Sequence, residues 1–266
     1  MATSKFFTVD LIPDCIAGDV SDNNGSTDIA GGDIIFNWTA VDIPKGSCML
    51  QSIQAYVNAE DGAYAAGSLT DYEIMFAKSV DGVAPPALGA IGAAQTACGE
   101  LRHHLIGAMR LESSASEGTL SKTTFGVVYM SCTNSNGDNG GRGASLPIVM
   151  DLEPDSGTNV GFDKLYVAAL QVSARNYGTG VLADGAVDAS SAQATEIVVK
   201  GVDARKLFSV GDTVYVHDLD TPIPGTLTKV EELKLTFSEA NTTVDIADND
   251  ELLNANPIRI KLGFER

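Results

Sequence analysis

Two adjacent histidines, His103 and His104, are the side chains best suited by type to hold a metal ion or to act as a base. Adjacent residues on a helix point about 100° apart, whereas two ligands of one metal are usually spaced at i and i+4. Glu100, three residues before His103, offers a carboxylate to the imidazole. We expect a structural or interface role for this pair, with metal binding or catalysis as the alternative. The third histidine, His217, alternates with Tyr215 in a strand-like run and is expected to face the surface.

Oxygen-rich acidic loops are the second group of candidates, because calcium takes six to eight oxygen ligands from flexible loops. The candidates are Asp22–Gly25, the pair Asp218 and Asp220, and the run Asp248–Glu251. Aligning Gly25 with the invariant glycine of a calcium loop puts Val20 at the first ligand position and Gly31 at the bidentate position. Neither side chain carries an oxygen. We expect solvated turns, with an unclassified cation site as the alternative at the two later places.

The run Gly178–Ala183 partly matches a glycine-rich dinucleotide-binding motif and follows the apolar, strand-like run Leu165–Val172. Such a motif must open a helix whose N-terminus receives the pyrophosphate. The next residues, Asp184–Ser190, have poor helical patterning and add two negative charges. The chain also contains no GxxxxGK(S/T) loop and no GxSxG motif. We expect no nucleotide site, no phosphoryl transfer and no α/β-hydrolase chemistry.

Sugar clefts usually stack their ligand on aromatic rings, and this chain is poor in them. Aromatic residues make up 6% of the sequence, and the single tryptophan, Trp38, lies in a strand-like run where core packing is its expected role. Two carboxylates from distant positions could still act together in glycoside hydrolysis, so an enzyme stays as the third alternative. The expectation is no catalytic residue, no metal ligand and no cofactor.

The charge of the chain makes whole classes of partner unexpected. The formal net charge is −18 at pH 7, with acidic residues dispersed over the loops. Nucleic acids and anionic membranes are bound through Lys and Arg, so neither is expected as a partner. No run approaches the roughly 18 apolar residues of a membrane helix, and the N-terminus lacks the pattern of a secretory signal. We expect a soluble chain made in the cytoplasm, whose acidity serves solubility or complements a basic partner.

The sequence contains four cysteines, Cys15, Cys48, Cys98 and Cys132. They are spaced too widely for a structural zinc site, which brings cysteines in close pairs. Without a signal peptide we expect them to be reduced and packed as small apolar side chains, with one or two disulfides as the alternative outside a cell. Glycosylation sequons, which mean little without a secretory route, begin at Asn24, Asn37 and Asn241.

Alternating and β-branched residues predict strands along most of the chain. The expected strands are 6–12, 34–38, 52–57, 72–77, 124–130, 164–172, 195–201, 211–217, 225–235 and 257–265. The main expected helix is Ala94–Leu111, where apolar residues recur at three- and four-residue spacing. Gly201, Gly211 and Gly225 mark expected turns with positive φ. With 27 glycines and one tryptophan, the chain is expected to be mainly all-β.

The stretch 176–194 is small and polar, and it is the expected domain boundary. We expect residues 1–190 to form a jelly-roll-like β-sandwich with one or two helices, completed by a terminal strand in 257–266. Residues 195–256 are expected to be a small β-barrel inserted before that strand. Apolar and polar residues alternate along Pro257–Glu265, which predicts a strand that needs a partner strand. We expect this last strand to be exposed, so that it can take part in assembly with another protein.

The C-terminal quarter resembles small SH3-like barrels found within virion proteins of tailed phages. The resemblance is carried by Phe208–Tyr215, Gly225–Val230 and Asp248–Leu252, and the ending Asn256–Glu265 is similar to the close of structural proteins of marine phages, particularly those of cyanobacteria. The first 190 residues carry no matching motif. The resemblance implies a cement or decoration protein that binds the outside of a capsid and reinforces the joints between major capsid subunits.

That function implies that the partner is the major capsid protein and that the chain lies on the capsid surface of the virion. It also implies a homo-oligomer, either a trimer or a dimer. It brings no catalytic residues. A tail protein, or a receptor- or glycan-binding module of the same virion, is the alternative; a cleft rich in exposed Tyr and Trp would favour it, and the low aromatic content counts against it.

Overall fold

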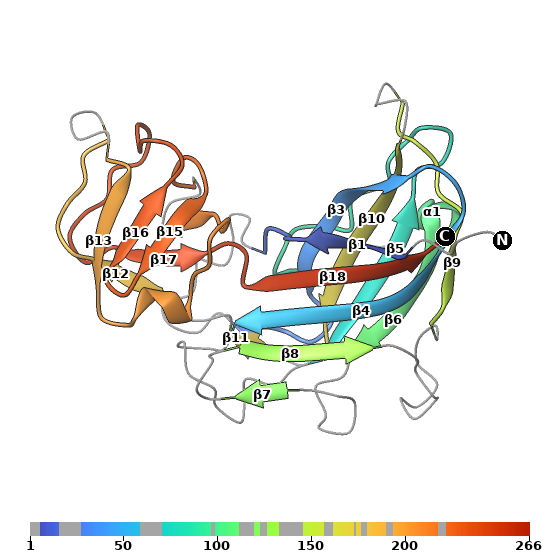
Figure 1. The fold of residues 1–266 in the computed structure, drawn as a ribbon, viewed down its shortest axis with the longest axis horizontal. Helices are drawn as coiled ribbons and strands as arrows, with labels where there is room; N and C mark the ends of the chain where they lie inside the picture. The colour runs from blue at the N-terminus through green and yellow to red at the C-terminus, as the bar shows by residue number, and fades with distance from the viewer. Residues whose placement is uncertain are drawn as a thin grey trace.

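The computed structural model shows an elongated molecule with two lobes of unequal size (Figure 1). It describes residues 6–15, 28–58, 71–96, 99–111, 120–122, 127–132, 146–156, 162–172, 174–176, 180–189, 194–217 and 222–266. Strands dominate both lobes, and within these ranges a single α-helix, α1 (Leu101–His104), occurs. The expectation of a mainly β protein is confirmed.

The larger lobe is built from two antiparallel sheets (Figure 1). The first contains, in spatial order, β1 (Phe6–Leu11), β18 (Ile258–Glu265), β4 (Cys48–Asn58), β8 (Val127–Cys132) and β7 (Leu120–Lys122), and β9 (Ile148–Met150) also pairs with β4. The second has the order β3 (Ile34–Pro44), β10 (Phe162–Gln171), β5 (Tyr72–Lys78) and β6 (Leu105–Leu111). A separate pairing joins β2 (Asp28–Ile29) to β11 (Arg175–Asn176).

Alternation along the strands sends apolar side chains from both sheets into one core. In β18, Ile258, Ile260, Leu262 and Phe264 are at most 2% exposed, and the residues between them are only partly buried. They share a cluster with Phe76 of the second sheet. Burying one such side chain contributes roughly 1.5–3 kcal/mol, so the last strand of the chain is a main support of the larger lobe.

The segment between β5 and β6 covers the other face of the second sheet. Leu88 and Ile91 of this segment are buried against Ile34 of β3, in a second, smaller cluster. Trp38 packs against the same cluster, and its Nε1 donates a hydrogen bond to the Pro86 carbonyl oxygen at 2.9 Å. The tryptophan therefore serves packing, as its sequence position predicted.

The smaller lobe is one six-stranded antiparallel sheet with its own core. Its spatial order is β14 (Val214–Val216), β17 (Glu251–Asn254), β12 (Val181–Ala183), β13 (Glu196–Lys200), β16 (Lys234–Phe237) and β15 (Leu227–Glu231), with a 3-10 turn at Ala204–Lys206. Backbone hydrogen bonds of Leu227 with Gly211 and Asp212 bring the start of β15 beside the segment before β14, so the sheet curls. Gly201, Gly211 and Gly225 have φ of 92°, 93° and 78°, as their turn positions predicted.

The helix expected over Ala94–Leu111 is mostly wrong. Of the described residues in this range, only Leu101–His104 are helical, and the residues that follow form β6, which pairs with β5. The apolar residues at helical spacing serve two different clusters, because Leu101 packs outside the second sheet and Met109 packs in the main core. Pairing with β5 thus outweighed the helical pattern. The single strand expected over 225–235 is likewise a hairpin, β15–β16.

Two further expectations differ from the pairing observed. β12 lies within residues 1–190, which the sequence assigned to the sandwich, but it pairs with β13 and β17 of the smaller lobe. Its Val181 and Ala183 are fully buried. The neighbouring residues in the sequence are small and polar, so the sequence did not indicate a buried strand here. β18 pairs with β1 on one side and β4 on the other, so the last strand is not the exposed strand expected for assembly.

Candidate functional site

α1 places its two histidines in different surroundings. His104 is 8% exposed, and its Nδ1 lies 2.9 Å from the Lys78 carbonyl oxygen. His103 is exposed, and its Nε2 accepts a hydrogen bond from Arg102 Nε at 3.3 Å. Glu100 contributes its backbone carbonyl, which accepts from the His103 N–H at 3.0 Å. The two imidazoles have separate partners and do not form one site.

The oxygens of Asp248–Glu251 are used within a turn. Asp248 forms an ion pair with Lys200 at 2.6 Å. Asp250 Oδ2 accepts a hydrogen bond from the backbone N–H of Ala247 at 2.7 Å. Donors of the protein itself therefore take up these carboxylates, as expected for a turn rather than for a cation site.

Gly180 gives the glycine-rich run 178–183 a structural explanation. The run leads into β12, and within residues 180–189 the chain forms a strand and a turn and no helix. A Cβ atom on Gly180 would lie 2.0 Å from the Leu252 carbonyl oxygen. This glycine therefore allows β12 to approach β17, which is a packing role and not a phosphate-binding one.

Two of the sequon asparagines have their amides engaged inside the structure. Asn37 Nδ2 donates to the Gly89 carbonyl oxygen at 2.7 Å. Asn241 is 0% exposed, and its Nδ2 donates to the Val244 carbonyl oxygen at 2.7 Å. Neither amide is available to carry a glycan in the folded protein.

Cys15 and Cys48 are free and buried. Burial raises the pKa of both thiols, which keeps them protonated and poorly reactive. Among the described residues, no three His, Cys, Asp or Glu side chains are grouped so that they could hold a metal ion. Several candidates lie outside the described residues, namely Asp22–Gly25 with Asn24, Cys98, Asp218 and Asp220. Cys132 is described only as the last residue of β8.

A cluster of Ser79, Asp155 and Tyr166 has the composition of a reactive site. Both hydroxyls donate to the Asp155 carboxylate, from Tyr166 at 2.6 Å. Burial and the hydrogen bond to Asp155 raise the pKa of Tyr166 to about 12. Ser79 is 0% exposed, so a substrate cannot reach its hydroxyl in this structure. The cluster instead anchors the segment after β9 to β5 and β10.

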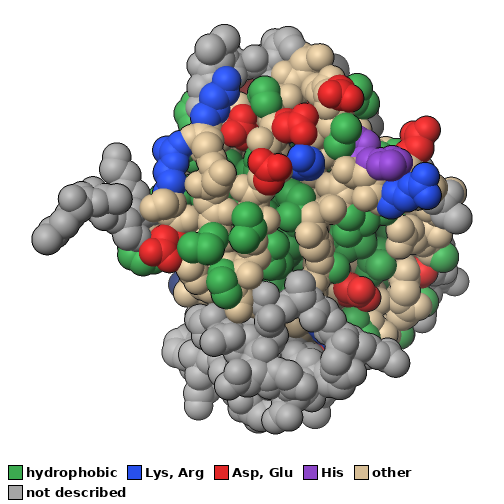
Figure 2. All heavy atoms as spheres, turned by 90° about the vertical axis from the view of Figure 1, so that its right-hand side faces the viewer, with side chains coloured by type: hydrophobic (Ala, Val, Ile, Leu, Met, Phe, Trp, Pro, Cys, Tyr) green, Lys and Arg blue, Asp and Glu red, His purple; other side chains and the backbone are tan. Residues whose placement is uncertain are grey.

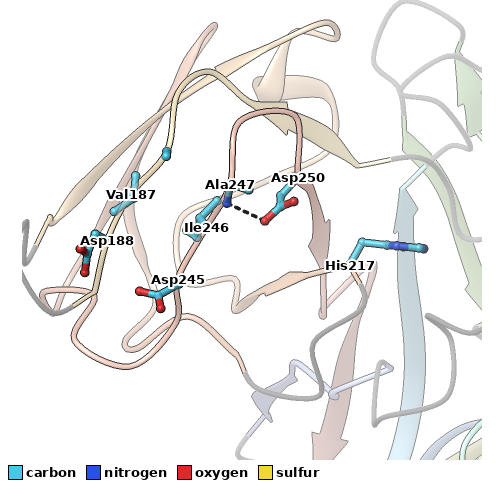
Figure 3. A pocket seen from close by; sticks show the side chains of 8 residues that line it. Val187, Asp188, His217, Asp245, Ile246, Ala247 and Asp250 are labelled. Carbon is cyan, nitrogen blue, oxygen red and sulfur yellow. Dashed lines mark hydrogen bonds between the residues drawn. The ribbon is translucent and has the colours of Figure 1, made fainter.

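The smaller lobe contains a groove. It lies where two segments are joined by hydrogen bonds between Val187 and Ile246, at 2.8 and 2.9 Å. The groove has a volume of about 480 Å³ and is lined by Ala186, Val187, Asp188, His217, Asp245, Ile246, Ala247 and Asp250. Figure 3 shows Asp188 and Asp245 toward one end and His217 at the other, with Asp250 between them. We call this feature the acidic groove.

Backbone donors fix two carboxylates of the acidic groove. Asp245 Oδ1 accepts from the Ala189 N–H at 2.9 Å, and Asp250 Oδ2 accepts from the Ala247 N–H. These carboxylates share the groove with the apolar side chains of Ala186, Val187 and Ala247, which are exposed or partly exposed. This combination suits a Lys or Arg side chain, whose aliphatic stem packs on apolar surface while its charged end meets a carboxylate.

A row of residues crosses the outer face of the first sheet where its strands end. The register sets Phe6 opposite Glu265, Glu265 opposite Met49, and Met49 opposite Val149. Phe6 is 71% exposed and Val149 is 64% exposed. We call these four residues the end row. Figure 2 views the end of the larger lobe that carries α1, β9 and the C-terminus, where hydrophobic side chains gather with acidic and basic ones around them. Exposed apolar groups of this kind favour contact with another protein.

The two lobes are tied together by hydrogen bonds on both sides of the connection into β18. The Cys15 N–H, just after β1, donates to the Ala255 carbonyl oxygen at 2.8 Å. Asn256 is buried, and its Nδ2 donates to the Pro13 carbonyl oxygen at 2.7 Å. This junction was not predicted from the sequence, where its one signal is the pair Asn254 and Asn256 before the last strand.

Comparisons with protein-family models, with curated proteins and with solved structures find no match to this chain. None of the described helices is long and apolar enough to cross a membrane. The described residues therefore define a two-lobed, mainly β protein with two surfaces suited to protein contact, the acidic groove and the end row.

Proposed function

We propose that this chain is a non-catalytic structural protein of a virion, which binds the outer surface of the capsid and stabilises the shell as a cement or decoration protein. The observation that carries the proposal is the strand order of the larger lobe. Its long strands, counted along the chain as β1, β3, β4, β5, β6, β8, β10 and β18, lie in the order 1-8-3-6 in one sheet and 2-7-4-5 in the other. Jelly rolls, a fold of viral capsid proteins and of lectins, have eight strands in two sheets, and we infer from this order that the larger lobe is one of them.

The smaller lobe supports the same proposal. It is inserted between the seventh and eighth of these strands, so the two sheets of the larger lobe are completed only after the insertion. Its strands are three to five residues long, turn at glycines and enclose a separate core. We infer a small SH3-like barrel, of the kind that the C-terminal sequence resembles in phage structural proteins.

Attachment to a capsid needs surfaces rather than a catalytic centre. The acidic groove complements a basic surface of the major capsid protein, and the end row offers apolar area. On a lattice with many equivalent positions, several modest contacts from one oligomer give lasting attachment. The proposed partners are therefore the major capsid protein and further copies of the chain.

The test is co-sedimentation of purified protein with undecorated capsids of the source phage, with bound copies counted by quantitative mass spectrometry. Saturable binding at hundreds of copies per capsid supports a cement protein. Saturation at a few copies would place the protein at the tail or at a vertex. Because jelly rolls also occur in lectins, a receptor- or glycan-binding module of the virion is the second candidate, and complete absence of capsid binding would favour it over the cement role.

A matched pair of charge variants shows whether the acidic groove makes the contact. The first variant carries Asp188→Asn, Asp245→Asn and Asp250→Asn, which retain an oxygen acceptor for the backbone donors. The control carries Asp42→Asn, Asp81→Asn and Asp151→Asn, which remove the same charge from exposed positions of the larger lobe. Loss of about tenfold or more in capsid affinity for the first variant alone would support the groove as the contact. Equal losses of capsid affinity in both variants would show that binding depends on net charge and not on the groove.

A further inference from the structure

β1 forms one edge of the first sheet, and within the described residues it pairs along one side only. Its six residues are in register with β18, from Phe6 opposite Glu265 to Leu11 opposite Ile260, without a bulge. The backbone N–H and C=O groups on the other side of β1 therefore form a regular row that a further strand can pair with. Edge strands recruit other strands in this way unless the protein protects them.

The other edges of the larger lobe carry such protection in the part of the chain that the structure describes. At the start of β3, the Ile34 N–H donates to the Ala93 carbonyl oxygen at 3.0 Å, and the Gly92 N–H donates to the Ile34 carbonyl oxygen at 2.8 Å. The pairing of β3 with β10 is also irregular. β7 is only three residues long, and the pairing of β6 with β5 contains a register shift. These are the devices that discourage edge-to-edge pairing.

The edges of the smaller lobe are protected as well. At β14, the Ile223 N–H donates to the Val214 carbonyl oxygen at 2.8 Å, so a neighbouring segment covers this edge. β15 has a register shift in its pairing with β16, and it carries Lys229 and Glu231 on a short strand. Among the residues that the structure describes, β1 is thus the edge that has a regular ladder, no covering segment and a single charged residue, Asp10.

The side chains of β1 leave apolar surface at this edge. Phe7 and Val9 pack against the main core but are only partly buried, whereas Leu11 is 1% exposed. The Phe7 ring stacks on Phe264 of β18, with ring centroids 5.1 Å apart, so one of its sides is already covered. A strand added beside β1 would cover the other sides of Phe7 and Val9 and complete the core at this corner.

We propose that β1 pairs with β1 of a second copy of this chain, antiparallel and about a two-fold axis at Thr8, so that the two first sheets join. Side chains along a strand alternate between the two faces of the sheet, so core-facing residues of one copy must lie opposite core-facing residues of the other. A two-fold axis at Thr8 meets this condition. Thr8 then opposes Thr8 of the second copy on the outer face, and Phe7 opposes Val9 on the core side. Thr–Thr pairs and aromatic–β-branched pairs are both favourable across antiparallel strands.

Charge also selects this register. With the axis at Thr8, the two Asp10 side chains are displaced by four residues, or about 13 Å along the strands. An axis at Asp10 would set two carboxylates opposite each other, which is destabilising. The resulting interface is isologous, with the same strand used by both copies, and it closes after two subunits. The pairing goes beyond the proposed capsid role and stands without it, because it depends on the edge alone.

The first test is sedimentation velocity of the full chain with Thr8→Lys. Two lysines would face each other at the axis, while the exposed position leaves the core of each subunit intact. We expect the wild-type chain to sediment as a dimer and Thr8→Lys to raise the dissociation constant at least about tenfold. The control is Thr228→Lys, an exposed threonine on the charged edge strand β15, which should leave the dimer unchanged. Equal thermal melting curves would show that both variants are folded.

The second test is oxidation of Thr8→Cys. Directly opposed residues of antiparallel strands bring their Cβ atoms to about 4.5–5.5 Å, from which a small adjustment allows a disulfide. A covalent dimer is expected on a non-reducing gel from Thr8→Cys and not from Thr228→Cys. A monomeric wild-type chain overturns the proposal, as does a Thr8→Lys variant with unchanged affinity. A Thr8→Cys dimer that forms no disulfide overturns the axis at Thr8.

Discussion

Arg259 Nη2 lies 2.6 Å from Asp212 Oδ1, and this ion pair connects the last strand of the larger lobe to the segment that leads into β14. The Asp212 side chain is 1% exposed, and that of Arg259 is 34% exposed. Asp212 also accepts hydrogen bonds from the Ser209 N–H at 2.7 Å and from Asn254 Nδ2 at 2.8 Å. Burial raises the pKa of Asp212, and the hydrogen bond from Arg259 opposes that rise. The pair therefore helps to fix the orientation of the smaller lobe on the sandwich.

Arg259→Ala should destabilise the protein because it leaves the Asp212 carboxylate buried without its counter-charge. Removing one partner of a buried pair costs about 3–5 kcal/mol, and the partial exposure of Arg259 reduces the expected loss to about 2–3 kcal/mol. Urea unfolding followed by circular dichroism measures this loss. The control is Lys261→Ala on the same strand, whose ion pair with Asp10 at 3.5 Å is exposed and should contribute less than about 1 kcal/mol. Equal losses for both variants would contradict a special role for the Asp212 pair.

Alkaline pH should destabilise the protein through two buried phenols. Burial, with Asp14 nearby, raises the pKa of Tyr215 from 10.0 to about 12, and Tyr166 is raised to about 12. A folded pKa above the unfolded pKa gives stability that is present below pH 10 and is lost as the pH rises through about 12. The loss should reach about 2–3 kcal/mol for each tyrosine. Thermal unfolding at a series of pH values from 10 to about 12 measures this loss of stability.

Tyr215→Phe isolates one part of this alkaline effect. The variant loses the hydrogen bond from the phenol to Asp14 at 3.2 Å, so it should be about 1 kcal/mol less stable at neutral pH. It should then lose less stability than the wild-type chain between pH 10 and 12, because the phenol no longer titrates. If the two proteins lost the same amount of stability across this pH range, Tyr215 would not have the raised pKa.

The sequence predicted strands where a single local pattern decides the structure. The alternation of apolar residues in Ile258–Glu265 fits only a strand with one buried face, and β18 is such a strand. In Leu105–Leu111 the apolar residues fit a helix as well as a strand, and pairing with β5 decides between them. That partner is distant in sequence, so the local pattern could not reveal the outcome.

The surfaces were harder to predict than the strands, because distant residues form them. The acidic groove exists because Val187 and Ile246 pair and thereby bring Asp188 beside Asp245. In the sequence these aspartates lie in unrelated polar turns. The free edge was assigned to the wrong terminal strand for a similar reason, since only the sheet order shows that β18 has neighbours on both sides, whereas β1 has one neighbour among the described residues.

Asn241→Ala should destabilise the smaller lobe. The Asn241 side chain is buried, its Nδ2 donates to the Val244 carbonyl oxygen, and its Oδ1 accepts from the Val244 N–H at 3.1 Å. The substitution leaves these backbone groups without partners, which should cost about 2–3 kcal/mol in unfolding free energy. Its neighbour Thr242 is exposed, so Thr242→Ala should change stability by less than about 0.5 kcal/mol. Comparable melting temperatures for the two variants would show that Asn241 is not needed for this turn.

Gly180→Ala should separate β12 from β17. The added Cβ would lie 2.0 Å from the Leu252 carbonyl oxygen and 2.6 Å from its carbonyl carbon, and these backbone atoms can move only if the pairing is disturbed. Overpacking of this kind costs about 1–3 kcal/mol or more, and a backbone obstacle favours the upper end. Hydrogen exchange should become faster in β12 and β17 while β4 and β18 of the larger lobe stay protected. Gly107→Ala is the control, because its Cβ would meet only Ile148 at an ordinary 3.6 Å. If the two variants exchanged alike, close packing would not be the reason for glycine at position 180.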